Sequence, residues 1–117
     1  MLIVDDDPRV RSAVARALRA EGIEVTTAAT GEEALALAQA QRFGTVISEL
    51  RMPGMGGIAM LQRMSVRQPG SRFVILTAAT DVDPGLVPPG HRTCVVRKPW
   101  TQEALLGAVL WSETPLF

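Results

Sequence analysis

Five polar residues in this sequence follow short apolar runs, and their side chains could act together on one ligand. The residues are Asp5 and Asp6 after the first run, then Glu49, Thr77 and Lys98 after three later ones. Buried charges are costly without partners, so such groups are expected to gather. Two acids, a backbone carbonyl and water suit a hard cation such as Mg²⁺. A cation, an ammonium and a hydroxyl together could bind a phosphoryl group.

The three carboxylates among these residues repel one another, and the sequence leaves open what balances them. They stay ionised together only beside a cation or another partner; otherwise the pKa of at least one rises. Mg²⁺ is one such partner, and the Lys98 ammonium is another. Simpler roles are also open: helix capping for Asp5 and Asp6, a neutral semi-buried acid for Glu49, and a backbone hydrogen bond for Thr77.

The pattern around these residues predicts strands that alternate with helices. Short apolar runs rich in β-branched residues predict strands over 2–4, 23–28, 45–48, 73–76 and 93–96. Capping residues predict helices after Asp7, Thr30 and Thr101, and a further helix over about 58–67. Residues 81–91 carry three prolines, each of which costs roughly 3 kcal/mol inside a helix, so a fourth helix is predicted to be short or missing there.

Such alternation predicts an α/β fold with right-handed crossovers between parallel strands. We expect a flavodoxin-like doubly wound five-stranded sheet with strand order 2-1-3-4-5. In that order the first and third strands are neighbours at the point where the winding reverses, which is where ligands bind. The acidic pair and Glu49 are therefore expected in one crevice.

Composition narrows the class of protein. The 117 residues suit one domain, and 12 basic against 12 acidic residues argue against direct nucleic-acid binding. The arginines crowding the first helix favour a solvated face. One cysteine excludes an internal disulfide, and no apolar run approaches the roughly 20 residues of a membrane span. No signal peptide is evident, so a cytoplasmic location is predicted.

Four motifs in order resemble the receiver domains of two-component response regulators. They are Leu-Ile-Val-Asp-Asp-Asp-Pro at 2–8, the loop 50–57 after an apolar strand, Leu-Thr-Ala at 76–78 and Arg-Lys-Pro-Trp at 97–100. The resemblance runs from residue 2 to about 110. It implies a signalling and protein-interaction module rather than an enzyme, with a receiver-like domain over 1–112 and a C-terminal tail over 113–117.

The resemblance implies a metal site and a phosphoryl site. Asp5 and Asp6 match the acidic pair that holds Mg²⁺, with Asp5 acting through water, and the backbone carbonyl of Arg51 matches another ligand. Glu49 stands where the family has its phosphate-accepting aspartate, and would also face the metal. The resemblance further implies that Thr77 is the switch hydroxyl and that Lys98 pairs with the phosphoryl group.

Two departures predict a degenerate site. Glu49 is one methylene longer than aspartate, and a misplacement near 1 Å can cost about 10²-fold in rate. Val95 replaces the usual aromatic switch residue. We therefore expect no useful phosphorylation, weak or absent Mg²⁺ binding, and a Glu49 side chain that partly mimics the phosphorylated state by reaching toward Lys98 or the metal.

Two other functions stay open from the sequence. One is a working phosphoryl acceptor through Glu49 or another acid such as Asp6. The other, more remote, is a metal-dependent phosphohydrolase, because Asp5-x-Asp7 after a strand loosely resembles haloacid-dehalogenase enzymes. The expected partners are a histidine kinase, a phosphotransfer protein or an output domain, and the sequence leaves a homodimer open.

Overall fold

Five short strands form one parallel sheet in the computed structural model, which describes residues 1–78 and 93–113. In sheet order they are β2 (Thr26–Ala28), β1 (Leu2–Val4), β3 (Thr45–Ser48), β4 (Arg72–Thr77) and β5 (Thr93–Arg97). The predicted order 2-1-3-4-5 is therefore confirmed. The segment 81–91, where a short or missing helix is predicted, lies outside the described residues.

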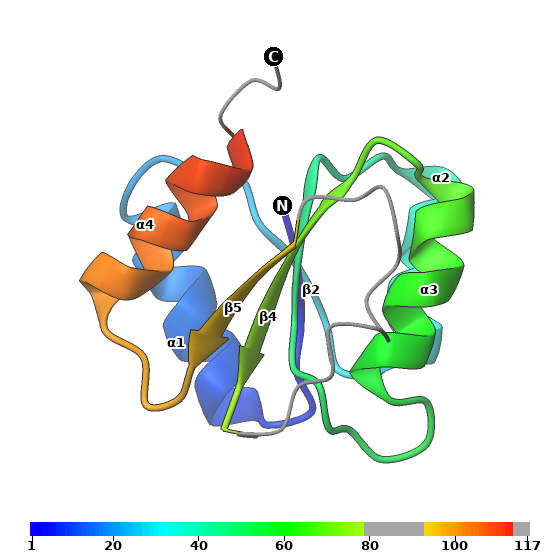
Figure 1. Ribbon diagram of the computed structural model, residues 1–117, viewed down its shortest axis with the longest axis horizontal. Helices are drawn as coiled ribbons and strands as arrows, with labels where there is room; N and C mark the ends of the chain where they lie inside the picture. The colour runs from blue at the N-terminus through cyan, green and yellow to red at the C-terminus, as the bar shows by residue number, and fades with distance from the viewer. Residues whose placement is uncertain (79–92, 114–117) are drawn as a thin grey trace.

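Helices cover both faces of this sheet (Figure 1). Helices α1 (Pro8–Arg19) and α4 (Gln102–Glu113) lie on one face, and α2 (Gly31–Ala40) and α3 (Gly57–Arg67) lie on the other. Three of them begin as predicted, because the side chains of Asp7, Thr30 and Thr101 accept hydrogen bonds from amides in the first helical turn.

The sheet is apolar on both faces because each face carries its own core. In β1, Leu2 and Val4 pack into the core under α2 and α3, whereas Ile3 packs into the core under α1 and α4. Side chains alternate along a strand, so a continuous apolar run is what a strand buried on both faces requires. Register pairs Val4 with Ser48, which brings the carboxyl ends of β1 and β3 level.

The second strand is shorter than the predicted span of 23–28. Parallel pairing starts at Leu2 with Thr26, so residues 23–25 extend past the first residue of β1. They pack against α1 and α4 instead, where Ile23 and Val25 are partly buried. Within the described residues, no helix has the length and apolar character needed to cross a bilayer.

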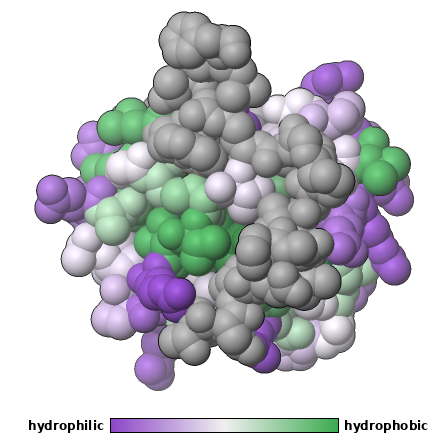
Figure 2. Space-filling view, in the orientation of Figure 1, coloured by the Kyte–Doolittle hydropathy of each residue, from purple (hydrophilic) through white to green (hydrophobic). Residues whose placement is uncertain are grey.

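Hydrophobic side chains gather near the middle of the face drawn in Figure 2. A shallow groove of about 540 Å³ between β5 and α4 is lined partly by Val95, Pro99, Trp100 and Ala104. Val95 is 41% exposed, whereas its neighbour Val96 is buried in the core. Val95, which stands in place of the usual switch aromatic, thus lies on the solvent side of an edge strand.

Candidate functional site

Three charged side chains meet at the carboxyl ends of β1, β3 and β5. The ammonium of Lys98 lies 3.1 Å from an Asp5 carboxylate oxygen and 3.2 Å from a Glu49 carboxylate oxygen. Their side chains are largely removed from water, with exposed fractions of 18% for Lys98, 3% for Asp5 and 11% for Glu49. Removal of Lys98 would leave two largely buried carboxylates without a cation, whereas removal of either carboxylate would leave Lys98 paired with the other. We call these three residues the Lys98 triad.

Backbone hydrogen bonds hold each member of the Lys98 triad directly after its strand. Each backbone amide donates to the last residue of the neighbouring strand: Asp5 to Ala28, Glu49 to Val4, and Lys98 to Thr77. The parallel ladders therefore extend one residue beyond the strands. This extension fixes the starting points of three side chains that are up to 93 residues apart in sequence.

Both carboxylates of the triad accept hydrogen bonds from the backbone as well as from Lys98. The second oxygen of Asp5 accepts from the Asp7 amide at 2.9 Å, and that of Glu49 accepts from the Leu50 amide at 2.6 Å. All four oxygens thus accept a hydrogen bond. The guanidinium of Arg11 adds a bond of 2.7 Å to the Asp5 backbone carbonyl. The length of Glu49 allows it to reach Lys98 while also bonding the next amide along the chain.

The pKa values of Asp5 and Lys98 are shifted by this arrangement. Burial raises the pKa of Asp5 above its ordinary 3.8; the Asp7 amide and the Lys98 ammonium offset only part of the rise, and the Glu49 charge adds to it. For Lys98, burial alone would lower the pKa, but the hydrogen bond and charge of Asp5 and the contacts of Glu49 raise it above 10.5. Lys98 therefore stays protonated at neutral pH, and Asp5 carries a desolvation cost.

This cost predicts how stability changes with pH. A carboxyl whose pKa is raised by folding contributes stability below its unfolded pKa, and loses that contribution as pH rises through the folded pKa. We therefore expect the free energy of unfolding of Asp5→Asn, minus that of the wild type, to become more positive as the pH rises above about 4. Urea denaturation of both proteins at several pH values measures this difference. A constant or oppositely sloped difference would contradict the proposed origin of the shift.

The hydrogen bonds and ion pairs of Asp5 and Glu49 use the carboxylate oxygens that the predicted metal site would need. Among residues 1–78 and 93–113, no cluster of three or more acidic, histidine or cysteine side chains is placed to hold a metal ion. The oxygens of Asp5 and Glu49 are turned to Lys98 and to backbone amides, and Asp6 is exposed. A Mg²⁺ site built from two acids, a backbone carbonyl and water needs fewer than three such side chains, so the metal site stays a prediction. The ammonium of Lys98 provides the positive charge.

The other predicted site residues lie at the same end of the sheet. Thr77 is fully buried as the last residue of β4, and Arg51 is exposed in the loop after β3. Of the residues predicted from the sequence, the side-chain hydrogen bonds and ion pairs described above join Asp5, Glu49 and Lys98, and a backbone hydrogen bond joins Lys98 to Thr77. The metal and switch roles of Asp6, Arg51, Thr77 and Val95 stay predictions.

A tight loop over residues 50–56 lies next to the triad. The Gly57 amide donates to the Leu50 carbonyl at 2.8 Å, and the Met55 amide donates to a Glu32 carboxylate oxygen on α2 at 3.2 Å. Gly54 has φ +72°, which favours glycine. The loop is thus held at both its ends, and the Leu50 amide that bonds Glu49 is part of it.

Two backbone donors of the site were not anticipated from the sequence, namely the amides of Asp7 and Leu50. The Asp7 amide could have been expected as a donor, because an aspartate side chain commonly accepts a hydrogen bond from the backbone amide two residues further along the chain. The Leu50 amide could not, since a bond from Glu49 to its own successor depends on the path of the loop.

This chain is similar in sequence to a known domain family and to several regulatory proteins. Residues 1–110 match the family model described as the response regulator receiver domain. The transcriptional regulator NtrC of Salmonella typhimurium is 38% identical over 81 residues, which cover 69% of this chain and 17% of that protein. The probable transcriptional regulatory protein TcrX of Mycobacterium tuberculosis is 37% identical, covering 71% of this chain and 36% of that protein. The chain thus spans well under half of these relatives.

Solved structures agree with the sequence match. The chemotaxis protein CheY4 of Vibrio cholerae has a TM-score of 0.83 and 31% identity, covering 95% of both chains. A response regulator protein from Burkholderia pseudomallei, solved with a phosphorylated aspartic acid, a calcium ion and citrate, has a TM-score of 0.81 and 28% identity. It is covered over 64% of its length, against 92% of this chain.

Proposed function

This chain belongs to the response regulator receiver domain family, and from this premise we propose that it is a pseudo-receiver whose Glu49 replaces the phosphate-accepting aspartate. Receiver domains of two-component signalling are generally signalling modules rather than enzymes, and they commonly bind Mg²⁺. In our proposal this chain transmits a signal through protein contacts without accepting a phosphoryl group at Glu49.

The contact between Glu49 and Lys98 carries this proposal. A nucleophilic carboxylate needs an oxygen free to attack and room for the incoming group. Here one Glu49 oxygen lies 3.2 Å from Lys98 and the other 2.6 Å from the Leu50 amide. These bonds hold the carboxylate away from an incoming group, and we expect the longer side chain to extend into the space where the phosphoryl group would be received.

The same contact supports a partial mimicry of the phosphorylated state. A phosphoryl group at the acceptor would face the ammonium of Lys98, and Glu49 presents a negative charge to that ammonium without modification. The mimicry is electrostatically incomplete, because a carboxylate carries one charge whereas a phosphate group carries about 1.5 to 2 at neutral pH. Glu49 would therefore hold the site in one state rather than switch it.

The partners that fit this role are proteins of a phosphorelay. The two relatives described above are named as transcriptional regulators, and the chain spans only a part of each. We propose that it contacts a histidine kinase, a phosphotransfer protein or an output domain, in the cytoplasm, over a domain of residues 1–112. A homodimer through the groove beside β5 is compatible with this role.

A phosphodonor experiment tests the proposal directly. The wild-type chain is incubated with Mg²⁺ and a small phosphodonor, and its intact mass is followed over time. We expect no stable gain of one phosphate. A gain that disappears in Glu49→Gln would refute the pseudo-receiver and establish a working acceptor at Glu49. A gain that persists in Glu49→Gln would establish another acceptor, and peptide mass mapping of the modified chain would show whether it is Asp6.

A further inference from the structure

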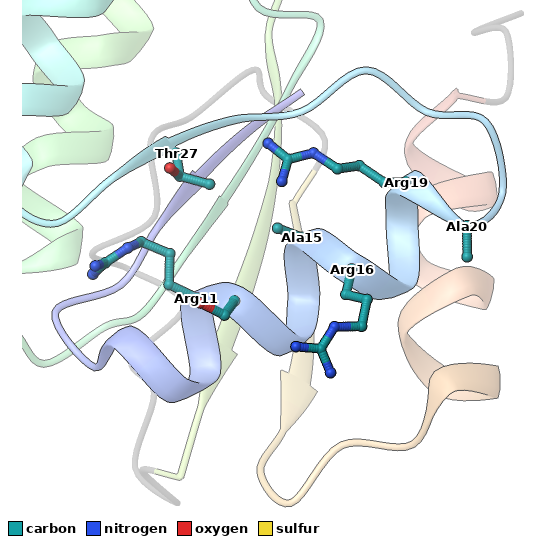
Figure 3. Close-up of a pocket in the computed structure, with 7 residues that line it drawn as sticks. Arg11, Ala15, Arg16, Arg19, Ala20 and Thr27 are labelled. Carbon is teal, nitrogen blue, oxygen red and sulfur yellow. The ribbon is translucent and has the colours of Figure 1, made fainter.

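A basic groove lies beside α1, and none of its lining residues belongs to the Lys98 triad. It has a volume of about 590 Å³, within the usual range for ligand pockets. Its lining residues come from α1 and the edge strand β2, and include Arg11, Ser12, Ala15, Arg16, Arg19 and Thr27. Figure 3 shows the three arginines extending from α1 in different directions, with Ala15 between them and Thr27 on the neighbouring strand. We call this the arginine groove.

Two of these arginines are held in place by the backbone. Arg11 donates to the Asp5 carbonyl at 2.7 Å, and Arg19 donates to the Val25 carbonyl at 3.1 Å. A guanidinium has five donor hydrogens, so each keeps others for a ligand. Arg16 is exposed between them. Within the described residues, no ion pair joins any of the three to a carboxylate.

The arginine groove is positively charged, although the chain as a whole has no net charge. The whole sequence has a net charge of zero, yet the lining residues of this groove include three arginines and no acid. The nearby acid Glu21 lines a different pocket beside α4, whereas Glu24 also lines an adjacent pocket that it shares with Arg19. A concave surface with one sign of charge concentrates counter-ions of the opposite sign. The groove is therefore suited to an anion.

The spacing of the arginines indicates what kind of anion. Arg11 and Arg19 are eight residues apart on one helix, which is about 12 Å along its axis. This length exceeds one phosphate and suits a chain of several. Guanidinium groups bind phosphate oxygens through paired hydrogen bonds, and the hydroxyls of Ser12 and Thr27 add neutral donors. We propose that the arginine groove binds a small oligophosphate-bearing ligand.

Calorimetric titration of the full chain with tripolyphosphate tests this proposal. We expect saturable binding, at least about tenfold weaker binding of orthophosphate, and a loss of about tenfold or more in Arg16→Ala. Arg63→Ala is the matched control, because Arg63 is an exposed arginine on α3, across the sheet. It removes the same charge and should change affinity by less than about twofold.

Three outcomes would overturn the proposal. The first is an absence of saturable tripolyphosphate binding by the wild type. The second is an equal loss in Arg16→Ala and Arg63→Ala, which would show a general charge effect. The third is tighter binding of a poly-glutamate peptide that displaces tripolyphosphate, which would assign the groove to an acidic protein segment. The groove lining contains neither Glu49 nor Lys98, so a failure here would leave the proposed pseudo-receiver untouched.

Discussion

Glu49→Asp should convert this chain into a phosphoryl acceptor. The substitution removes one methylene and withdraws the carboxylate from the Leu50 amide and from Lys98, which it now contacts at 2.6 and 3.2 Å. Since a misplacement near 1 Å can cost about 10²-fold in rate, we expect the rate of phosphoryl transfer to rise by about that factor or more. The intact mass after incubation with Mg²⁺ and a small phosphodonor measures it.

Glu49→Asn is the matched control for this experiment. It has the same length as aspartate but lacks a nucleophilic carboxylate, so it should gain no phosphate. If Glu49→Asp accepts no more phosphate than the wild type while remaining folded, side-chain length is not the obstacle. The cause would then lie in another departure of the site, such as the exposed Val95 in place of an aromatic residue.

The fold was largely predictable because several local signals agree with one another. Capping residues, apolar runs and the alternation of strands with helices all favour the same doubly wound sheet. The start of α1 after Asp7 and the start of α4 after Thr101 follow from single hydrogen bonds near in sequence. The predicted length of β2 was wrong, because the true length depends on where β1 begins and so on the register between the two strands.

The site was predictable only in part. That Asp5 and Glu49 meet follows from strand order, since they follow the neighbouring strands β1 and β3. Lys98 follows β5, with β4 between it and β3, and its long side chain reaches both acids. The competition between metal and ammonium could not be resolved from sequence. It depends on about 1 Å of reach and on the path of the loop 50–56, which supplies the Leu50 amide. These quantities arise from packing between distant segments rather than from local pattern.

Gly57→Ala should be the most destabilising small substitution near the site. A Cβ at this position would lie 2.1 Å from the Glu49 carbonyl oxygen and 2.9 Å from the Leu50 Cα, both of which are backbone atoms. Neither can turn aside as a flexible side chain would, so the loop 50–56 must move. We expect a loss of about 3 kcal/mol or more in the free energy of unfolding, measured by urea denaturation.

Gly56→Ala is the control for this prediction, because its Cβ would meet nothing closer than the Leu50 carbonyl at 3.7 Å and its φ of −70° suits any residue. It should cost less than about 1 kcal/mol. The movement forced by Gly57→Ala also displaces the Leu50 amide, and with it the hydrogen bond that holds Glu49 beside Lys98. A Gly57→Ala protein as stable as Gly56→Ala would show that the loop yields freely. Glu49 would then lack the rigid support that our explanation of its inactivity requires.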